Sequence, residues 1–454
     1  MEKLRKRIVV TGMYDITPFG GSEAMMASIY ARKSAITPLP QEYNHCPTRI
    51  GGIIPDFDLA SWIDAKEVFR TIRRGSRPSQ LVGATAYKAL RQARLLGDDG
   101  KLLASQRERT GVAIGTDFGD IKLISDMAVR MHLLEQAVAS EEKTRILRET
   151  VTAHFLSAYQ ALPDAETYLS AMGLGAEGPS STLVKACATG PGNIRLAAME
   201  IDIGAADIMV AGAVTQLTPQ AVMIFNMLGT RNPNQIQGAL SRRNDEPQRA
   251  SRPFDQHHDG FVPSEGATVM VIESLESALK RDVTPLAELT GFGSTTDARS
   301  PTDPHPAIQE RAIWQALEMA GKKPEDIDLL KDHCTGTLIG DIVAAKVIKA
   351  VWGNRRIPII VPKCWLGHQL ANAGTVEASV AIRVMNFGVI PPAINWEDPI
   401  AETLLCEESH HHTFPYCYFN IPLQPTRAKI KTVVCTSAGF GGQNAPLVLE
   451  KFEG

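Results

Sequence analysis

Three side chains far apart in the sequence have the types that nucleophilic catalysis needs, and the first is Cys187. It lies in LVKACATGPGN (183–193), where small residues separate an apolar, strand-like run from a helical pattern. A cysteine on a tight strand-to-helix turn lies near the positive end of the helix dipole, which favours the nucleophilic thiolate. Taken alone, the residue also fits a small buried core cysteine. The segment alone therefore does not distinguish a catalytic cysteine from a structural one.

Two histidines support the catalytic interpretation. His333 closes a predicted strand and precedes a Thr/Gly turn, and His368 lies in a glycine-rich loop that begins with Lys363 and leads to Glu377. Each histidine alone is most often structural. A cysteine and two histidines, each at the end of an element in an α/β chain, match the arrangement of nucleophilic catalysis. A glycine-rich turn at 436–450 adds backbone N–H groups that can approach a reacting carbonyl oxygen.

The elements that must position these side chains alternate between strand and helix, the pattern of α/β packing. Strands are predicted at 7–11, 111–115, 181–186, 208–211, 268–273, 287–291, 327–333, 359–361 and 432–437, and helices at 80–95, 193–203, 306–321, 340–352 and 374–387. The same order of elements occurs twice: a helix, a polar loop, and a strand that ends in a Gly/Thr turn. This repetition predicts a duplicated fold whose halves meet near residues 275–290.

A long charged segment between residues 117 and 161 interrupts this pattern. Its apolar residues recur at helical spacing, at Ile121, Ile124, Met127 and Met131. We expect a helical insertion because the apolar stripe is kept.

Composition narrows the class of protein. The chain has 454 residues, 44% of them hydrophobic, and a net charge of −3, which argues against nucleic acid or an anionic membrane as the main partner. No stretch approaches the length of a membrane span. Seven cysteines without CxxC spacing and no secretion signal predict reduced thiols and a cytoplasmic location.

Five ordered motifs resemble the signatures of the β-ketoacyl synthases, condensing enzymes of the thiolase fold. They are ACATG (186–190), SRPFDQHHDGFVPSEGA (251–267), HCTGTLIGD (333–341), KCWLGH (363–368) and GFGGQNA (439–445), and RIVVTGMYDITPFG (7–20) is similar to the family's first strand and turn. The resemblance implies two βαβαβ-type halves that form a five-layered α-β-α-β-α core. Residues 1–280 would hold the nucleophile and 281–454 the two histidines.

The resemblance also implies roles. Cys187 is similar to the nucleophile that accepts an acyl chain from an acyl carrier protein. His333 and His368 resemble the pair that assists decarboxylation of a malonyl thioester, Lys363 the lysine near the second histidine, and Glu377 the glutamate that supports the network. The family reaction is a decarboxylative Claisen condensation that needs no cofactor or metal, because the malonyl carboxylate is the source of the carbanion.

Further residues are assigned through the same resemblance. The backbone amides of Cys187 and Phe440 would form the oxyanion hole, and Phe440 resembles a gating aromatic on a mobile glycine loop. Phe118 and Phe225 are placed in the acyl pocket, where Phe118 would shorten the tunnel. Asp117 beside it is unexpectedly polar.

Two residues depart from the family pattern. Cys334 stands where the family has glycine, and Trp365 is bulkier than usual. With Phe118, these departures favour a specialised condensing enzyme of fatty acid or type II polyketide biosynthesis.

Other functions remain open at this point. A non-catalytic chain-length-factor subunit resembles the family but commonly lacks the nucleophile, whereas this chain retains Cys187 together with His333, His368 and Lys363. A thiolase would use a second cysteine, for which Cys435 is in the right region, but GFGGQN after Cys435 resembles the synthases. A chalcone-synthase-like enzyme would have asparagine in place of His368. The partners implied are an acyl carrier protein and a second subunit, as a homodimer or a heterodimer with a chain length factor.

Surface features refine the partner predictions. A basic segment holding Lys66, Arg70, Arg73, Arg74 and Arg77 is the candidate carrier-protein surface. The family pairs through a strand near the nucleophile, for which 182–186 is the candidate. GLGAEG (173–178) precedes a strand and so fails as a dinucleotide motif, and HHH (410–412) lacks the spacing of a zinc site.

Overall fold

Both halves of the chain build the same arrangement of strands. The computed structural model describes residues 4–137, 139–152, 157–228, 239–400 and 419–454, with the side chains of all of these except 147–152 and 157–158. The first half contributes β1 (Ile8–Thr17), β5 (Thr110–Thr116), β6 (Ser180–Ser181), β7 (Ile208–Thr215) and β8 (Gly266–Ser274). The second half contributes β9 (Ala287–Phe292), β11 (Leu329–Lys331), β12 (Ile359–Ile360), β15 (Thr432–Cys435) and β18 (Leu447–Glu450).

Strand order shows the duplication directly. The first half has the order β1-β8-β7-β5-β6 and the second β9-β18-β15-β11-β12, so equivalent strands occupy equivalent places. The directions agree as well: β5 is parallel to β6 and β7, as β11 is to β12 and β15. Antiparallel pairing of β1 with β9 joins the halves. This repetition supports the proposed division near residue 280.

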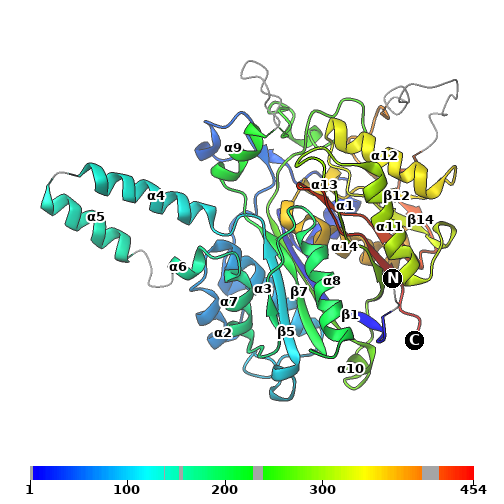
Figure 1. The fold of residues 1–454 in the computed structure, drawn as a ribbon, viewed down its shortest axis with the longest axis horizontal. Helices are drawn as coiled ribbons and strands as arrows, with labels where there is room; N and C mark the ends of the chain where they lie inside the picture. Colours follow the sequence, from blue (N-terminus) through cyan, green and yellow to red (C-terminus); the bar gives the residue numbers. More distant parts are fainter. Residues whose placement is uncertain (1–3, 138, 153–156, 229–238, 401–418) are drawn as a thin grey trace.

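Helices fill the spaces beside and between the two half-sheets (Figure 1). Helix α3 (Arg77–Gln92) covers the outer face of the first half, and α11 (Pro306–Ala320) and α12 (Leu338–Trp352) lie on the outer side of the second. Helices α8 (Thr189–Asp202) and α14 (Leu370–Phe387) pack between them. The result is the expected five-layered α-β-α-β-α core.

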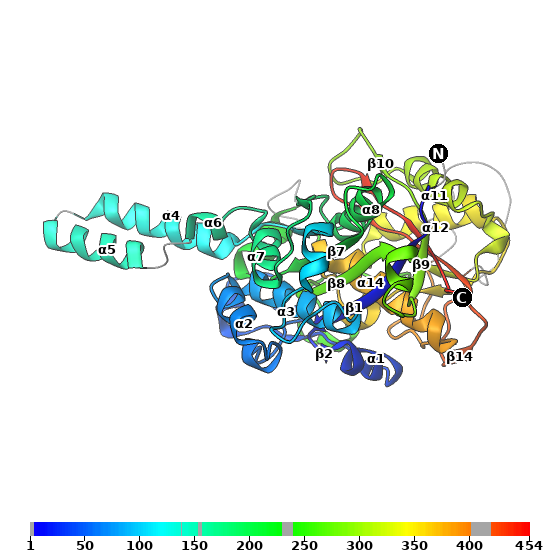
Figure 2. The ribbon, with the colours of Figure 1, turned by 90° about the horizontal axis from the view of Figure 1, so that it is seen from below.

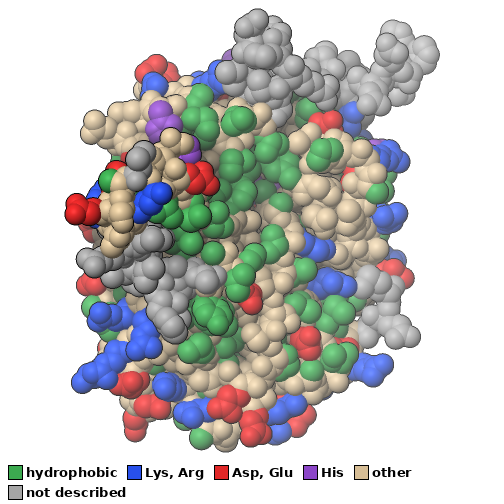
Figure 3. Space-filling model, turned by 60° about the vertical axis from the view of Figure 1, so that its left-hand side comes forward, with side chains coloured by type: hydrophobic (Ala, Val, Ile, Leu, Met, Phe, Trp, Pro, Cys, Tyr) green, Lys and Arg blue, Asp and Glu red, His purple; other side chains and the backbone are tan. Residues whose placement is uncertain are grey.

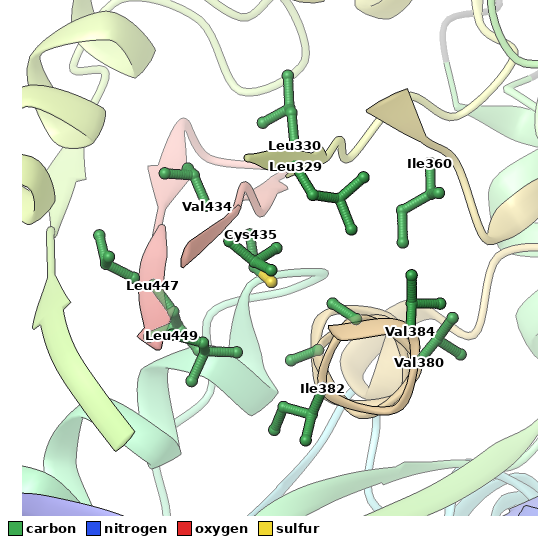
Figure 4. Close-up of a cluster of buried hydrophobic side chains, with 14 of the residues drawn as sticks. Leu329, Leu330, Ile360, Val380, Ile382, Val384, Val434, Cys435, Leu447 and Leu449 are labelled. Carbon is green, nitrogen blue, oxygen red and sulfur yellow. The ribbon is translucent and has the colours of Figure 1, made fainter. Parts of the chain in front are cut away.

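The central helix α14 is buried along most of its length. Every residue from Leu370 to Ile382 is buried, which its many small residues permit. A Cβ on Gly190 of α8 would lie 1.7 Å from the Thr375 hydroxyl oxygen, so glycine allows the two central helices to touch. Figure 4 shows Val384 and Val380 on the side of the helix that faces Ile360 of β12, whereas Ile382 points away from that strand.

The predicted helical insertion is confirmed and forms an arm. It contains α4 (Ile121–Gln136), α5 (Ser140–Thr152) and α6 (Ser157–Gln160). Helices α4 and α5 pack together and project away from the layered core (Figures 1 and 2). The apolar stripe of α4 is not buried by its own chain, since Ile124, Met127 and Met131 are 47%, 38% and 54% exposed.

The predicted strand at 181–186 is wrong beyond its first residue. Only Ser180 and Ser181 pair with β5, and the chain then leaves the sheet to approach the loop that carries Cys187. The predicted strand at 327–333 is also too long, because β11 ends at Lys331.

The remaining elements are short or peripheral. They are α1 (Ser22–Tyr30), α2 (Lys66–Ile72), α7 (Ala165–Leu174), α9 (Pro219–Met227), α10 (Leu275–Leu279), α13 (Lys363–Leu366), the 3-10 turns Gln41–Tyr43, Leu59–Ser61, Ala104–Arg109, Pro247–Arg249 and Pro324–Asp326, and the two-residue strands β2 (Gly20–Gly21), β3 (Thr37–Pro38), β4 (Ile50–Gly51), β10 (Thr295–Thr296), β13 (Val389–Ile390), β14 (Thr426–Arg427), β16 (Ala438–Gly439) and β17 (Gln443–Asn444). Within the described ranges, no helix is both long and apolar enough to cross a bilayer.

Candidate active site

Cys187 lies on a sharp turn just before α8. The preceding residue, Ala186, has φ +47°, a left-handed conformation that is uncommon for a residue other than glycine. The Thr189 hydroxyl accepts a hydrogen bond from the Lys185 backbone N–H at 2.8 Å, which closes the turn. The β16 residue Gly439 approaches so closely that a Cβ there would lie 3.0 Å from the Cys187 nitrogen. The turn thus fixes the thiol against the glycine-rich loop.

His368 is brought to this thiol by the loop between α13 and α14. Gly367 turns the chain with φ +71°, and the His368 backbone N–H then donates to the Val262 carbonyl at 2.7 Å. The imidazole Nε2 lies 3.1 Å from the Cys187 sulfur. Its other face is supported by the Phe261 ring, whose centroid is 5.0 Å away.

His333 completes the group from the loop after β11. Its backbone N–H donates to the Thr436 hydroxyl at 2.9 Å, and its ring centroid lies 5.6 Å from that of His368. The Lys363 ammonium lies 3.2 Å from His333 Nδ1 and donates to its carbonyl at 2.6 Å. Because an ammonium only donates, Nδ1 accepts, and the neutral ring carries its proton on Nε2. The structure therefore supplies a hydrogen-bond donor at His333 Nε2.

A buried charge network holds Lys363. Its ammonium also donates to Glu377 Oε1, and Lys331 donates to Glu377 Oε2 at 2.7 Å. All three side chains are at most 2% exposed. The expected contact of Lys363 with Glu377 is present, but Lys331 was not among the predicted site residues. Its signal in the sequence is a lysine two positions before His333, at the end of a strand whose other two residues are leucines.

Burial of Cys187 opposes the thiolate that a turn at the start of a helix favours. Burial raises the pKa of the Cys187 thiol to about 12, and this outweighs the lowering by the Lys363 charge and by a hydrogen bond from the Phe440 backbone N–H. Burial and the Lys363 charge also hold the pKa of both His333 and His368 well below the usual value. These shifts favour a neutral thiol beside a neutral imidazole, because burial disfavours the charged form of each group.

An open cavity adjoins these groups. Its volume is about 980 Å³, and its lining includes Cys187, His333, His368 and Phe440. The hydrogen bond from Phe440 places that backbone amide beside the sulfur. An acyl thioester at Cys187 would therefore have N–H groups from both loops within reach of its oxygen.

Aromatic side chains continue behind the cavity. Phe225 stacks against Phe440 at 6.3 Å between centroids, and it also contacts Phe118 at 5.7 Å and Phe261 at 5.5 Å. Phe261 and Phe440 line the cavity, whereas Phe118 and Phe225, which were predicted in the acyl pocket, are not in its lining and belong to the apolar cluster that packs against these two rings. Asp117, next to Phe118, has one carboxylate oxygen without a hydrogen-bond partner among the described residues.

The other predicted residues have structural surroundings. Cys334 and Trp365 are both buried, and the Trp365 indole donates to the Pro392 carbonyl at 3.1 Å. Arg77 pairs with Glu265 at 2.8 Å, so it is not a free surface cation. The HHH run at 410–412 lies outside the described residues.

A five-layered duplicated fold with a cysteine and two histidines around one cavity defines a thiolase-type condensing enzyme. Two family models match the chain: Beta-ketoacyl synthase, N-terminal domain, over residues 5–278, and Beta-ketoacyl synthase, C-terminal domain, over residues 286–397. The chain belongs to the β-ketoacyl synthase family. It is an acyltransferase that carries out β-ketoacyl-acyl carrier protein synthase condensation.

Individual relatives agree over the full length. The chain is 31% identical over 459 residues to 3-oxoacyl-acyl-carrier-protein synthase 2 of Coxiella burnetii, with 99% of both chains covered. It is 31% identical to the chloroplastic 3-oxoacyl-acyl-carrier-protein synthase I of Arabidopsis thaliana, covering 99% of this chain and 87% of that one. Among solved structures, a β-ketoacyl synthase from Burkholderia phymatum superposes with a TM-score of 0.83 at 26% identity, covering 99% of this chain and all of the other. The ishigamide ketosynthase/chain length factor gives 0.79 at 26% identity, with the same coverage.

Proposed function

We propose that Cys187 carries the growing acyl chain and that His333 and His368 act on the malonyl thioester. The observation that carries this proposal is the 3.1 Å contact between His368 Nε2 and the Cys187 sulfur, beside the His333 ring. During acylation, the thiol proton passes to His368 Nε2 as sulfur attacks the acyl carbonyl, and then to the departing thiolate of the carrier protein. The imidazole is thereby returned to its neutral state.

Condensation then uses the same groups in a second role. Malonyl-acyl carrier protein loses CO₂, and the electron pair of the broken C–C bond forms an enolate. His333 Nε2 donates to the enolate oxygen, and His368 becomes a second donor once its proton has moved from Nδ1, where acylation leaves it, to Nε2. The enolate carbon attacks the acyl carbonyl, whose oxygen is held by the amides of Cys187 and Phe440. Collapse of this intermediate breaks the bond between the carbonyl carbon and sulfur, which yields the β-ketoacyl product on the carrier protein and expels Cys187 as a thiolate. The thiolate then takes up a proton from solvent through the open cavity.

The pathway is proposed to be type II polyketide or specialised fatty acid biosynthesis. The packing of Phe118 and Phe225 behind the cavity supports a short or diverted acyl pocket. A solved structure of a type II PKS acyl-carrier protein in complex with its ketosynthase bound to the hexaketide superposes with a TM-score of 0.80 at 25% identity, covering 99% of this chain and all of that one. An acyl carrier protein is therefore the proposed partner.

The proposed location is the cytoplasm. The five described cysteines are all free and buried, which supports a reducing compartment.

A second subunit is also proposed, as a second copy of this chain or a chain length factor. Strand β6 is at an edge of the sheet, where a strand of another subunit could pair. The exposed apolar side chains of the arm could be buried against the same subunit. Hydrophobic side chains also gather in a broad patch on the face turned forward in Figure 3. Light scattering of the purified chain would distinguish a homodimer from a monomer that awaits a different partner.

Mass spectrometry after mixing with an acyl thioester tests the central proposal. We expect one acyl group on the tryptic peptide 186–195, and none in Cys187→Ala. A chain-length-factor function, the alternative, predicts no adduct on the wild-type chain.

A further inference from the structure

A second lysine reaches the catalytic network through Glu377. Lys331 ends β11, and its side chain is 0% exposed. Its ammonium donates to Glu377 Oε2 at 2.7 Å and also to the Thr436 backbone carbonyl. Glu377 uses its other oxygen to accept from Lys363. One buried carboxylate is therefore shared by two buried ammonium groups.

Lys331 is connected to His333 by two routes. One passes through Glu377 to Lys363, which contacts both the ring and the carbonyl of His333. The other passes through Thr436, whose carbonyl Lys331 holds and whose hydroxyl accepts from the His333 backbone N–H. Both the side chain and the backbone of His333 depend on groups that Lys331 fixes.

The cost of this arrangement indicates a function. Transferring an ammonium group from water to a protein interior costs several kcal/mol unless it is fully compensated. Lys363 already pairs with Glu377, so Lys331 is a second ammonium group on the same carboxylate. The adjacent carboxyl of Asp332 is also buried, and burial raises its pKa, which disfavours a compensating negative charge there. The neighbours of Lys331 in the strand, Leu329 and Leu330, are fully buried apolar residues. An apolar side chain at this position would avoid the free-energy cost of burying an ammonium group.

We propose that Lys331 is a positioning residue for the condensation, acting through Glu377 on the orientation and charge of His333. This inference rests on the proposed role of His333. Lys331 limits the movement of the carboxylate, and its charge opposes protonation of the imidazoles, which must be neutral to take part in proton transfer.

The charge effect has a defined direction. The Lys331 charge contributes to lowering the pKa of both His333 and His368. Without it, both imidazoles would bind a proton at higher pH. The reaction requires neutral rings. As the pH is lowered, a chain without the Lys331 charge would therefore lose activity at a higher pH than the wild-type chain. The charged and titratable groups around the two rings are Lys331, Asp332, Lys363, Glu377, Cys187 and Cys334.

The test compares Lys331→Met with the wild-type chain. Methionine keeps the length of the side chain and removes its charge and its donors. Lys322→Met is the matched control, because it breaks another lysine–glutamate pair, with Glu450 at 2.7 Å, outside the cavity lining. The measurements are acylation of Cys187 and decarboxylation of malonyl-acyl carrier protein across pH 5–9, together with the melting temperature.

We expect Lys331→Met to slow decarboxylation about ten- to a hundredfold, the size of loss that a misplaced catalytic group produces. Acylation of Cys187 should fall less, and the acid limb of the decarboxylation profile should move to higher pH. Lys322→Met should match the wild-type chain in both reactions. If Lys331→Met melts below the assay temperature, Lys331→Gln, which keeps a donor but no charge, is measured instead and should show the same shift of the acid limb.

Two results would overturn the inference. A folded variant with wild-type decarboxylation, or one with a uniformly lower rate and an unshifted acid limb, would assign Lys331 to stability alone. Failure of the wild-type chain to become acylated or to decarboxylate the malonyl thioester would instead overturn the proposed function.

Discussion

The protonation state of Cys187 can be tested by the pH dependence of its alkylation. Burial raises the pKa of this thiol from 9.0 to about 12. Each unit changes the thiolate fraction tenfold, so at neutral pH the site holds about 10³ times less thiolate than an ordinary cysteine. We expect the rate of alkylation by iodoacetamide to rise about tenfold per pH unit from pH 6 to 10 without a plateau.

The sequence provides a convenient readout. Cleavage after Lys185 and Arg195 gives a peptide, residues 186–195, in which Cys187 is the only cysteine. Its alkylation can therefore be followed by mass spectrometry without interference from the other thiols.

Asp117→Asn is the informative second variant. The charge of Asp117 raises the pKa of Cys187, and burial raises the pKa of Asp117 itself to about 7. The variant should therefore react faster than the wild-type chain above pH 7, where Asp117 is ionised, and equally below it. A plateau of the wild-type rate between pH 6 and 8 would show a stable thiolate and refute the reasoning.

Three further predictions concern primer length, the pH dependence of stability, and docking of the carrier protein. Phe118→Ala should raise kcat/KM for long acyl primers relative to short ones, because the proposed short pocket ends at the packed rings of Phe118 and Phe225; an unchanged ratio would remove the short-pocket proposal. Glu166→Gln should melt at a higher temperature than the wild-type chain at pH 9 and at the same temperature at pH 4. Burial raises the pKa of Glu166 to about 8, so the folded wild-type chain loses stability as the pH rises through that value; equal melting temperatures at pH 9 would contradict this. Charge reversal at the exposed Arg73 and Arg74 should raise KM for carrier-bound substrate and leave a small thioester analogue unaffected, whereas an equal effect on both would exclude a docking role.

Much of the fold could be predicted because the buried strands and amphipathic helices have strong periodicity. The long strands β5, β7 and β8 and the helices α3 and α11 were all found, with ends that differ by a few residues. The strand predicted at 181–186 failed for a tertiary reason. Its apolar residues leave the sheet because the chain must reach the turn at Ala186, which no local pattern reveals.

The site residues could be predicted where they lie in motifs that resemble those of the family. Cys187, His333, His368, Lys363 and Glu377 are brought together as the resemblance implied. The protonation state of the thiol was not predictable, because the desolvation that raises its pKa depends on how closely the surrounding loops pack.

Lys331 was missed for a related reason. A lysine at the end of a strand is usually a solvated edge residue, and only the position of α14 shows that Glu377 lies 2.7 Å from it.

A single-turnover experiment tests most directly whether the thiol and the two imidazoles serve one reaction. The chain would first be acylated at Cys187, freed of excess primer and then mixed with malonyl-acyl carrier protein. We expect the acyl group to leave peptide 186–195 as CO₂ is released and a carrier-bound β-ketoacyl chain two carbons longer appears, all at one rate. Release of CO₂ while the acyl group stays on Cys187, or formation of the product by Cys187→Ala, would contradict the account.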